Sequence, residues 1–323
     1  MNTISLGMET LLALAVVGSW KYLAASWIRR KIEQQFQYFG TVSCLNLYPV
    51  KGCHATRVKS AKCGPRGLEV NGVMDRCIMV VDKQTGLGQY MRHFPKMTYI
   101  NITVEGEAIV LDAPGMETLI LPHSPDRNCT KFLCEIHACK LLVRDFGDKA
   151  SKWIGKYLGN DNLRLVYFLE NNNRLTIETE NNRRQGNIKI SQEDKISFSC
   201  ISSYLLGNER TLEEISRRTT EPVKMDNFRP NIVIDGLSPF EEDTWSQIRI
   251  GEDTIFRCQE PCKRCMVTTI DPVTAERSQR NEPLKTLKTY KEEVGGVPTS
   301  FGVYAAVESG GEIQVGDQVY VLK

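Results

Sequence analysis

The sequence has no long uncharged hydrophobic run, little histidine and almost no net charge. Its 323 residues include 41 Lys plus Arg, 39 Asp plus Glu and four His, so the formal net charge is +2. A charge this small gives no global cationic field, which argues against a nucleic-acid-binding protein. Hydrophobic residues make up 41% and charged residues 25%, an ordinary globular composition that excludes global disorder.

Several cofactor and nucleophile motifs are also missing. No G-x-G-x-x-G follows a strand-like segment and no P-loop is present, so the sequence indicates no nucleotide site. The lack of G-x-S-x-G argues against an α/β-hydrolase. No repeat with a period of about 20 to 50 residues occurs, which argues against solenoids and propellers.

Cysteine is abundant by contrast, with eleven residues. A secreted protein would pair its cysteines and leave one over, so we interpret them as reduced thiols in a cytosol-facing protein. Cys258, Cys262 and Cys265 form a C-x3-C-x2-C pattern. A second group consists of Cys129, Cys134, His137 and Cys139. Structural zinc usually takes four ligands and a second paired element, which is missing, so zinc is only a minor alternative at either place.

The spacing around Cys265 favours a thiolate. Lys263 and Arg264 stand between Cys262 and Cys265, and nearby positive charge lowers the pKa of a thiol. A soft thiolate also suits a transition metal that takes sulfur ligands. On spacing alone, a buried structural cysteine remains the alternative.

Three further cations stand at the ends of strand-like segments. They are Lys51, Arg76 and Arg229. Together they could line a pocket for a phosphorylated anionic cofactor, to which arginine gives two-pronged contacts. The alternative is that each is a solvated surface charge.

Residues 1–36 differ in composition from the rest of the chain. Thr10 to Trp20 carries no charge, and the apolar character resumes after Lys21 and stops at a basic cluster that begins with Arg29. A bilayer needs about 20 mostly apolar helical residues, a length reached here only if Lys21 is accepted. No positive segment precedes the run, unlike a cleaved signal peptide. We interpret residues 1–36 as a membrane anchor with a basic flank; an amphipathic or buried helix is the alternative.

From Gly40 onward, short apolar runs separated by Gly, Pro and Asn predict an α+β, mainly β fold. Strands are expected at 77–81, 99–104 and 118–121, and a strand followed by a turn at 232–236. A hairpin turn is expected at 83–86 and a final strand pair within 312–321. Helical spacing predicts a helix at about 148–158. A second helix is expected around 211–218. The polar segment 170–192 is expected to be a surface loop or crossover.

Five segments in a fixed order resemble the mitochondrial amidoxime-reducing components, a family of molybdenum enzymes with a MOSC domain. They are YPVKGC, DRCIMVVD, NFRPNIVI, PCKRCMVTTIDP and the terminal GDQVYVLK. The resemblance implies an N-terminal MOSC-type β-barrel domain at 37–175 and a MOSC domain carrying the molybdenum ligand at 176–323. It also implies that the anchor lies in the mitochondrial outer membrane, with the catalytic part facing the cytosol.

The resemblance assigns roles to particular residues. In this family the metal is held by a phosphorylated pterin, as Mo-molybdopterin, and by the second Cys of a C-x-R-C motif. That position is Cys265, which is therefore implied to be both catalytic and the molybdenum ligand, while Cys262 has a supporting role. The positions implied to bind the cofactor are Lys51, Gly52, Arg76, Ser202, Arg229, Lys263, Arg264 and Tyr304.

The implied activity is the reduction of N-hydroxylated compounds such as amidoximes, hydroxamic acids and N-hydroxylated base analogues. Electrons would come from NADH through cytochrome b5 reductase and cytochrome b5, in keeping with the missing nucleotide motif. A non-catalytic cofactor carrier or a sulfur-transfer protein is the alternative, although the chain lacks a pyridoxal-phosphate-dependent desulfurase domain. Two positions depart from the family: Gly52 replaces a common Ser, and Cys200 replaces an acidic residue near the metal, which puts the substrate range in question.

Overall fold

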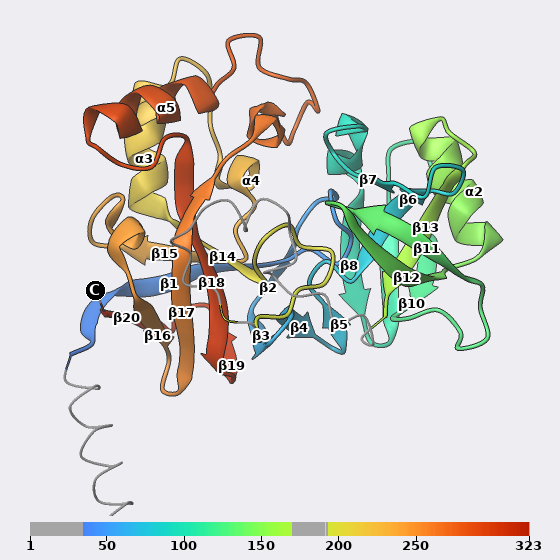
Figure 1. The fold of residues 1–323 in the computed structure, drawn as a ribbon, viewed down its shortest axis with the longest axis horizontal. Coiled ribbons are helices and arrows are strands. Elements are labelled where there is room, and N and C mark those ends of the chain that lie inside the picture. Colours follow the sequence, from blue (N-terminus) through green and yellow to red (C-terminus); the bar gives the residue numbers. More distant parts are fainter. Residues whose placement is uncertain (1–34, 170–190, 192, 323) are drawn as a thin grey trace, which may run out of the picture.

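The computed structural model describes residues 35–169, 191 and 193–322. A barrel of seven strands occupies one side of the molecule (Figure 1). In order around the barrel these are β15 (Ile232–Gly236), β14 (Tyr204–Asn208), β18 (Ser300–Ser309), β17 (Thr254–Lys263), β16 (Gln247–Ile250), β20 (Gln318–Leu322) and β1 (Gln37–Leu47). The pairing of β1 with β15 closes the barrel, and β2 (Thr56–Val58) extends it beside β1.

Strand β1 closes the barrel because it is long and irregular. Its register shifts once along its pairing with β15 and once along its pairing with β20, as expected of β-bulges that bend a strand. In the pairing of β1 with β15, Gly40 lies opposite Gly236. A Cβ on Gly40 would collide with the carbonyl oxygen of Asp235, so this close approach requires glycine.

The remaining strands form three further sheets. The first consists of β11 (Lys131–Ile136), β12 (Cys139–Asp145), β13 (Leu163–Phe168), β6 (Ile78–Asp82) and β7 (Gly88–Gln89). The second consists of β10 (Leu119–Pro122), β9 (Ala108–Asp112) and β8 (Asn101–Glu105). The third consists of β19 (Glu312–Gln314), β3 (Ser60–Gly64), β4 (Gly67–Val70) and β5 (Val73–Met74). Helix α2 (Asp148–Leu158) lies on the side away from the barrel (Figure 1).

One hydrophobic core joins the barrel to these sheets. The same buried cluster contains Phe39 and Phe256 of the barrel and Ile109, Trp153 and Leu165 of the other side. Two strands also cross between the halves of the sequence: β1 belongs to the barrel, and β19 pairs with β3. The predicted boundary at 175/176 therefore separates segments that share one core, and it stays a prediction.

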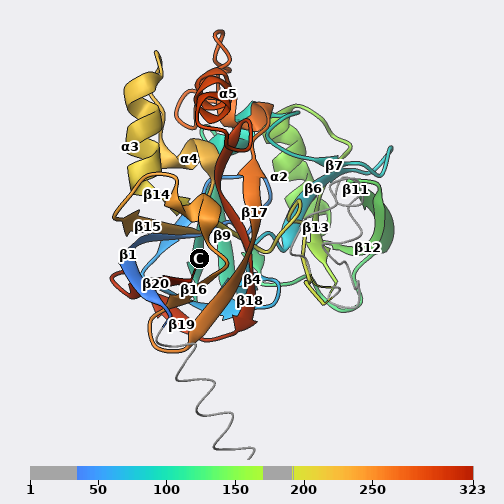
Figure 2. The same cartoon turned by 60° about the vertical axis from the view of Figure 1, so that its left-hand side comes forward.

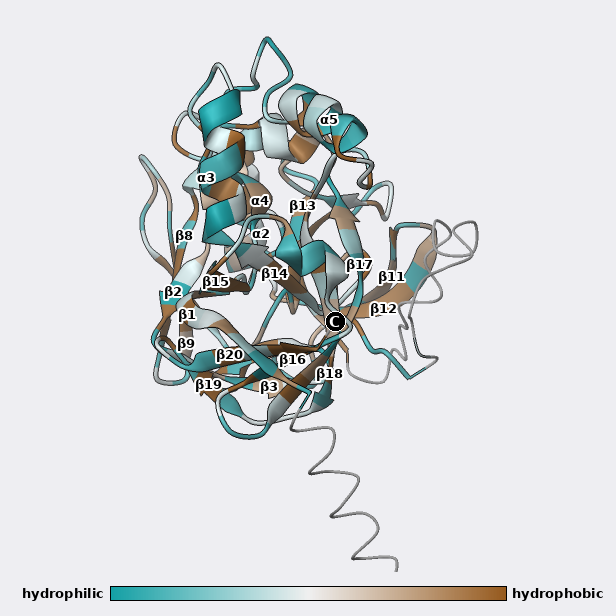
Figure 3. Ribbon diagram, turned by 90° about the vertical axis from the view of Figure 1, so that its left-hand side faces the viewer, coloured by the Kyte–Doolittle hydropathy of each residue, from teal (hydrophilic) through white to brown (hydrophobic). Residues whose placement is uncertain are grey.

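Three helices lie at one end of the barrel (Figures 1 and 2). They are α3 (Glu209–Arg218), α4 (Met225–Phe228) and α5 (Leu284–Glu293). A separate buried cluster holds them to β18 and consists of Ile215, Phe228, Leu287 and Phe301. Much of α3 is hydrophilic, as expected for a helix with one buried stripe (Figure 3). Short 3-10 helices complete the fold: η1 (Pro95–Tyr99), η3 (Glu241–Thr244) and η4 (Met266–Thr269).

The mainly β fold and most of the predicted elements are confirmed. Helix α2 has the predicted bounds, whereas strand β15 continues through Asp235 and Gly236, where a turn was predicted. Helix α3 begins two residues before the predicted start, because the side chain of Asn208 caps it by accepting a hydrogen bond from the backbone N–H of Arg210. The prediction of a final strand pair was wrong: β19 pairs with β3, whereas β20 pairs with β1 and β16. A turn at Gly316, with φ of 96°, takes the chain from one sheet to the other.

Two predicted features lie outside the described residues. These are nearly all of the membrane anchor at 1–36 and nearly all of the polar segment at 170–192. Within the part of the chain that the structure describes, no helix has the length and apolar character needed to cross a membrane.

A buried carboxyl group links η3 to the start of α3. Glu242 is 1% exposed and accepts hydrogen bonds from Asn208 Nδ2 at 2.9 Å and Thr211 Oγ1 at 2.7 Å. Burial raises the pKa of Glu242 from 4.5 to about 7, although both hydrogen bonds oppose the rise. This carboxyl therefore titrates near neutral pH within a packed network.

The free energy of unfolding should fall as the pH rises from about 5 to 8. The folded protein binds the Glu242 proton more tightly than the unfolded chain does. The resulting stabilisation is complete below pH 4.5 and is lost as the pH rises through 7, a difference of about 3 kcal/mol. Urea unfolding over this pH range should show a flatter profile for Glu242→Gln than for Glu252→Gln, an exposed control. Equal slopes in the two variants would contradict the assignment.

Candidate functional site

Backbone hydrogen bonds bring the first two predicted cofactor segments together. The segment after β1 runs beside the start of β6: Arg76 N–H donates to Tyr48 O at 2.7 Å, and Ile78 N–H donates to Pro49 O at 2.9 Å. Lys51 N–H donates in turn to Ile78 O at 2.8 Å. These contacts hold Lys51 and Arg76 on adjacent segments.

Asp75 is the buried hub of this region. Its side chain is fully buried, and Oδ1 accepts hydrogen bonds from Tyr48 N–H and Asn231 Nδ2, each at 2.9 Å. Its Oδ2 pairs with Arg76. Burial raises the pKa of Asp75, and Arg76 together with both hydrogen bonds counteracts the rise. One carboxylate thus ties together the end of β1, the start of β6 and the segment before β15.

Arg76 and Arg229 share one aromatic ring. Their guanidinium carbons lie 4.8 and 4.3 Å from the ring centroid of Tyr48, and Arg76 Nη2 donates to Arg229 O at 3.4 Å. Both residues have positive φ, 49° and 57°, a strained backbone typical of functional sites. Burial lowers the pKa of Arg229, and the like charge of Arg76 adds to the effect. We call this pair of arginines, with Tyr48, the cationic recess.

The cationic recess contains an unsatisfied donor. Arg229 Nη2 is buried and has no hydrogen-bond partner among the described residues. Buried polar groups are nearly always paired, so each exception needs an explanation. An anionic oxygen placed beside Arg229 would provide the missing acceptor and offset the repulsion between the two arginines.

Lys51 lies in the wall of the site. It is 6% exposed, and its Nζ donates to Phe198 O at 2.8 Å and to Cys200 Sγ at 3.2 Å. The same ammonium lies 5.3 Å from the centroid of the Tyr90 ring. The next residue, Gly52, has φ of 92°, and a Cβ there would lie 3.1 Å from Met91 N. This turn therefore favours glycine at position 52.

Cys265 presents an accessible thiol beyond the end of β17. The residue is exposed, and its carbonyl accepts hydrogen bonds from Thr268 N–H at 3.0 Å and Thr268 Oγ1 at 2.8 Å. These bonds fix the backbone at the start of η4 while leaving the thiol open. Cys262 differs, because it is buried and burial raises the pKa of its thiol despite the neighbouring Arg264.

Arg264 points into the protein. Its Nη1 donates to Cys262 Sγ at 2.8 Å and its Nη2 to Phe228 O at 2.5 Å, which joins β17 to the end of α4. Its Nε is buried and has no hydrogen-bond partner among the described residues. The arginine thus positions Cys262 and leaves one donor available.

The other predicted cofactor positions lie on or near β17 and β18. Ser202 is buried, and its hydroxyl donates to Ala305 O at 2.6 Å, so its proton is already used within the protein. Tyr304 is half-buried; burial, reinforced by the charge of Cys262, holds the pKa of its phenol well above the usual range. Lys263 is exposed at the end of β17.

Sequence reasoning missed three residues of the site. Tyr90 and His137 lie in connecting segments, after β7 and between β11 and β12, where no periodic pattern marks a functional residue. Asp75 could have been found from the sequence, because it stands directly before the predicted site residue Arg76 and an apolar run. Tyr90 interacts electrostatically with Cys200, whose negative charge also affects the pKa values of Tyr304 and Cys262.

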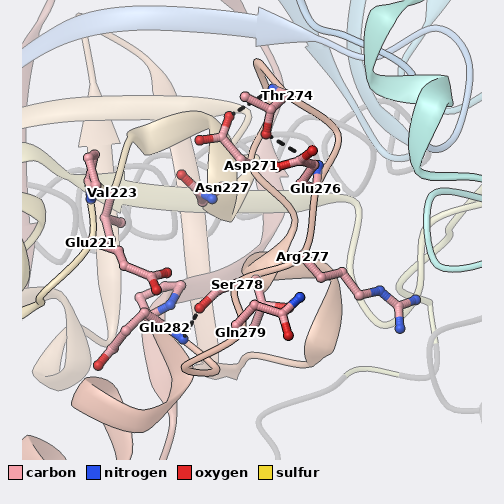
Figure 4. A pocket seen from close by; sticks show the side chains of 13 residues that line it. Glu221, Val223, Asn227, Asp271, Thr274, Glu276, Arg277, Ser278, Gln279 and Glu282 are labelled. Carbon is pink, nitrogen blue, oxygen red and sulfur yellow. Dashed lines mark hydrogen bonds between the residues drawn. The ribbon is translucent and has the colours of Figure 1, made fainter.

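A separate pocket of about 370 Å³ lies beside α4 and the segment after η4 (Figure 4). Its side chains include Asn227, Asp271, Glu276, Arg277 and Glu282, and none of the predicted cofactor residues lines it. The zinc alternatives gain no support from the geometry. In residues 35–169 and 193–322, no three His, Cys, Asp or Glu side chains come together in a metal-binding arrangement.

Comparisons with known proteins agree with this organisation. The family described as MOSC domain matches residues 193–320, and the family described as MOSC N-terminal beta barrel domain matches residues 39–161. The chain is 34% identical to mitochondrial amidoxime-reducing component 1 of Mus musculus, over 98% of this chain and 92% of the relative. The Homo sapiens protein of that name is 34% identical over 100% and 93%, and mitochondrial amidoxime reducing component 2 of Rattus norvegicus is 35% identical over 98% and 92%.

Removing the charge of Asp75 should destabilise the protein strongly. Asp75→Asn leaves Arg76 largely buried without its anionic partner, a change that typically costs about 3 to 5 kcal/mol. Asp235→Asn is the matched control, because Asp235 pairs with Arg210 at 3.2 Å where both side chains are 43–45% exposed. Such surface pairs contribute about 1 kcal/mol or less. Similar urea midpoints for the two variants would rule out the role of Asp75 as a hub.

Proposed function

The chain belongs to the family of the mitochondrial amidoxime-reducing components, and we propose that it is a molybdenum-cofactor-dependent reductase of N-hydroxylated compounds. The observation that carries the proposal is the buried Arg229 Nη2, which lacks an acceptor among the described residues; the exposed thiol of Cys265 supports it. The relatives' names refer to amidoximes, which supports amidoximes as substrates. The proposed class also includes hydroxamic acids and N-hydroxylated base analogues, which contain the same N–O bond.

The residues present fit Mo-molybdopterin, a phosphorylated pterin. Arg76 and Arg229 would hold its anionic part, since Arg229 Nη2 has no acceptor in the described part of the chain and the two like charges lie on one ring. Cys265 would supply a sulfur ligand to the metal, for which a soft thiolate is suited. When bound, this group supplies the two-electron chemistry that removes oxygen from nitrogen.

The contributions of the chain itself are binding, orientation and proton supply. Reduction of an amidoxime to an amidine consumes two electrons and two protons and releases water. Lys51 carries a proton on Nζ at the wall of the site, 3.2 Å from Cys200 Sγ. Arg264 anchors the Cys262 side of the loop through Phe228 O, so Cys265 projects from a fixed backbone.

We further propose that the electrons come from NADH through cytochrome b5 reductase and cytochrome b5. The sequence contains no nucleotide motif, which supports an external donor. We place the protein in the mitochondrial outer membrane with its catalytic part facing the cytosol. The relatives' names support a mitochondrial location, the apolar segment after Thr10 supports an anchor, and eleven free thiols suit a reducing compartment.

A non-catalytic cofactor carrier is the second candidate. Cys200 favours it, because the resemblance implies an acidic residue near the metal at this position, which is Cys in this sequence. A sulfur-transfer protein is the third candidate, and it would use the accessible thiol of Cys265. Metal content and turnover separate these functions, because a carrier binds the cofactor without reducing a substrate.

Arg229→Met should lower the cofactor content of the purified protein. Removing the guanidinium takes away the donor that lacks an acceptor in the cationic recess, and we expect at least about a tenfold loss of bound molybdenum and pterin. The control is Arg217→Met, whose side chain is 71% exposed on α3. Molybdenum is measured by elemental analysis and pterin by fluorescence after release. Equal cofactor content in both variants would exclude Arg229 as a cofactor residue.

Cys265→Ala should abolish the reduction of benzamidoxime. The assay supplies NADH, cytochrome b5 and its reductase, and we expect a loss of at least about 100-fold because the proposed metal ligand is gone. Cys129→Ala, a half-buried cysteine outside the site, is the control and should retain activity. Wild-type protein that binds molybdenum but reduces no N-hydroxylated compound would favour the carrier. Wild-type protein without molybdenum, made in cofactor-replete cells, would contradict both functions.

A further inference from the structure

Cys200 differs from nearly every other cysteine in the protein. Of the eleven thiols, only Cys200 and Cys265 are exposed. Burial raises the pKa values of Cys53, Cys63 and Cys77 to about 12, as expected of inert structural thiols. Cys200 therefore offers a second accessible sulfur, which the function proposed above does not use.

The segment that carries Cys200 is held firmly in place. Phe198 N–H donates to Arg76 O at 3.1 Å, and Ser197 Oγ donates to Asp75 O at 2.9 Å. The ring of Phe198 packs edge-on against Phe168, with centroids 5.3 Å apart. The hub at Asp75 thus positions Cys200 as well as the cationic recess.

Two basic side chains converge on the sulfur. Lys51 Nζ lies 3.2 Å from Cys200 Sγ, and His137 acts electrostatically on the same thiol in favour of its charged form. Burial alone would raise the pKa of Cys200, but the charge of Lys51 and the contact with His137 outweigh it and bring the pKa well below the usual range. Cys200 is exposed, so its thiol stays open to solvent beside the ammonium of Lys51.

Four other titratable side chains affect the ionisation of the Cys200 thiol or are affected by it. Among the described residues, Cys200 also interacts electrostatically with Arg76, Tyr90, Cys262 and Tyr304. Arg76 is a cation, and burial raises the pKa values of Tyr90, Cys262 and Tyr304, which therefore stay neutral at pH 7. The charged side chains named here around Cys200 are thus cations, and cationic surroundings are typical of reactive cysteines.

We propose that Cys200 is a resident thiolate that positions Lys51 and His137 at the open side of the site and is open to modification by soft electrophiles. Without this anion, the buried Lys51 ammonium loses the negative charge that lies 3.2 Å from its Nζ. The positioning role rests on the proposed function. The ionisation of the thiol does not, so the two are tested separately.

Alkylation with iodoacetamide tests the ionisation in the full-length protein. The thiolate displaces iodide and forms a thioether, so the rate follows the ionised fraction, which is about 1% at pH 7 for a thiol with a pKa near 9. Peptide mapping should show Cys200 reacting at pH 7 and below. Cys44, a half-buried thiol whose pKa burial raises, is the internal control and should react slowly.

Lys51→Met should reduce the rate at Cys200 by at least about tenfold at pH 7, and Lys195→Met, an exposed lysine five residues away in sequence, should not. A reactivity midpoint for Cys200 near pH 9 in the wild type would overturn the thiolate. An unchanged rate in Lys51→Met would overturn the role of Lys51. Neither result depends on whether the protein is a reductase.

Charge-conserving replacement tests the positioning role. Cys200→Asp keeps an anion beside Lys51, whereas Cys200→Ser places a neutral hydroxyl there. We expect Cys200→Asp to retain molybdenum content and the wild-type pH profile of kcat while resisting iodoacetamide. Cys200→Ser should lower kcat at least about tenfold with a shifted pH profile and little change in KM. A serine variant that matches the wild type in kcat and pH profile would overturn the proposal, even if the reductase activity itself is confirmed.

Discussion

The buried carboxylate of Asp75 is the interaction on which the geometry of the site depends. It holds the end of β1 through Tyr48 N–H, pairs with Arg76 and binds Asn231 before β15. An isolated buried carboxylate would be costly, and these three partners supply the compensation that burial requires. Two consequences follow from this one network. The guanidinium of Arg76 is directed at the ring of Tyr48 beside Arg229, and the segment leading to Cys200 is attached through Asp75 O and Arg76 O.

Barrel closure explains why such distant segments meet. Strand β1 pairs with β15 and β20 of the C-terminal half, and its end carries Tyr48 and Lys51 to the site. The C-terminal half contributes Arg229 after α4 and Cys265 after β17. Because both halves share one hydrophobic core, the recess and the accessible thiol are parts of one packed unit. The site thus forms where the halves of the sequence join.

Local sequence patterns predicted the positions of helices and strands better than they predicted which strands pair. Helix α2 and strand β15 follow directly from helical spacing and from an apolar run ended by Asp-Gly. The separation of β19 from β20 could not be predicted, because each strand pairs with a segment more than 200 residues away in sequence. Cys265 and Arg229 could be predicted as site residues because each lies in a short motif of the sequence. Tyr90 and His137 lie in connecting segments, and only the three-dimensional fold brings His137 to Cys200.

The central claim is that the cationic recess and Cys265 together hold a phosphorylated molybdenum cofactor. Anomalous diffraction at the molybdenum edge from crystals of the cofactor-loaded protein tests it most directly. We predict a single anomalous peak within bonding distance of Cys265 Sγ, with the phosphate of the pterin on Arg229 Nη2. A molybdenum peak bonded instead to Cys200 Sγ, or one remote from both the recess and Cys265, would contradict the account.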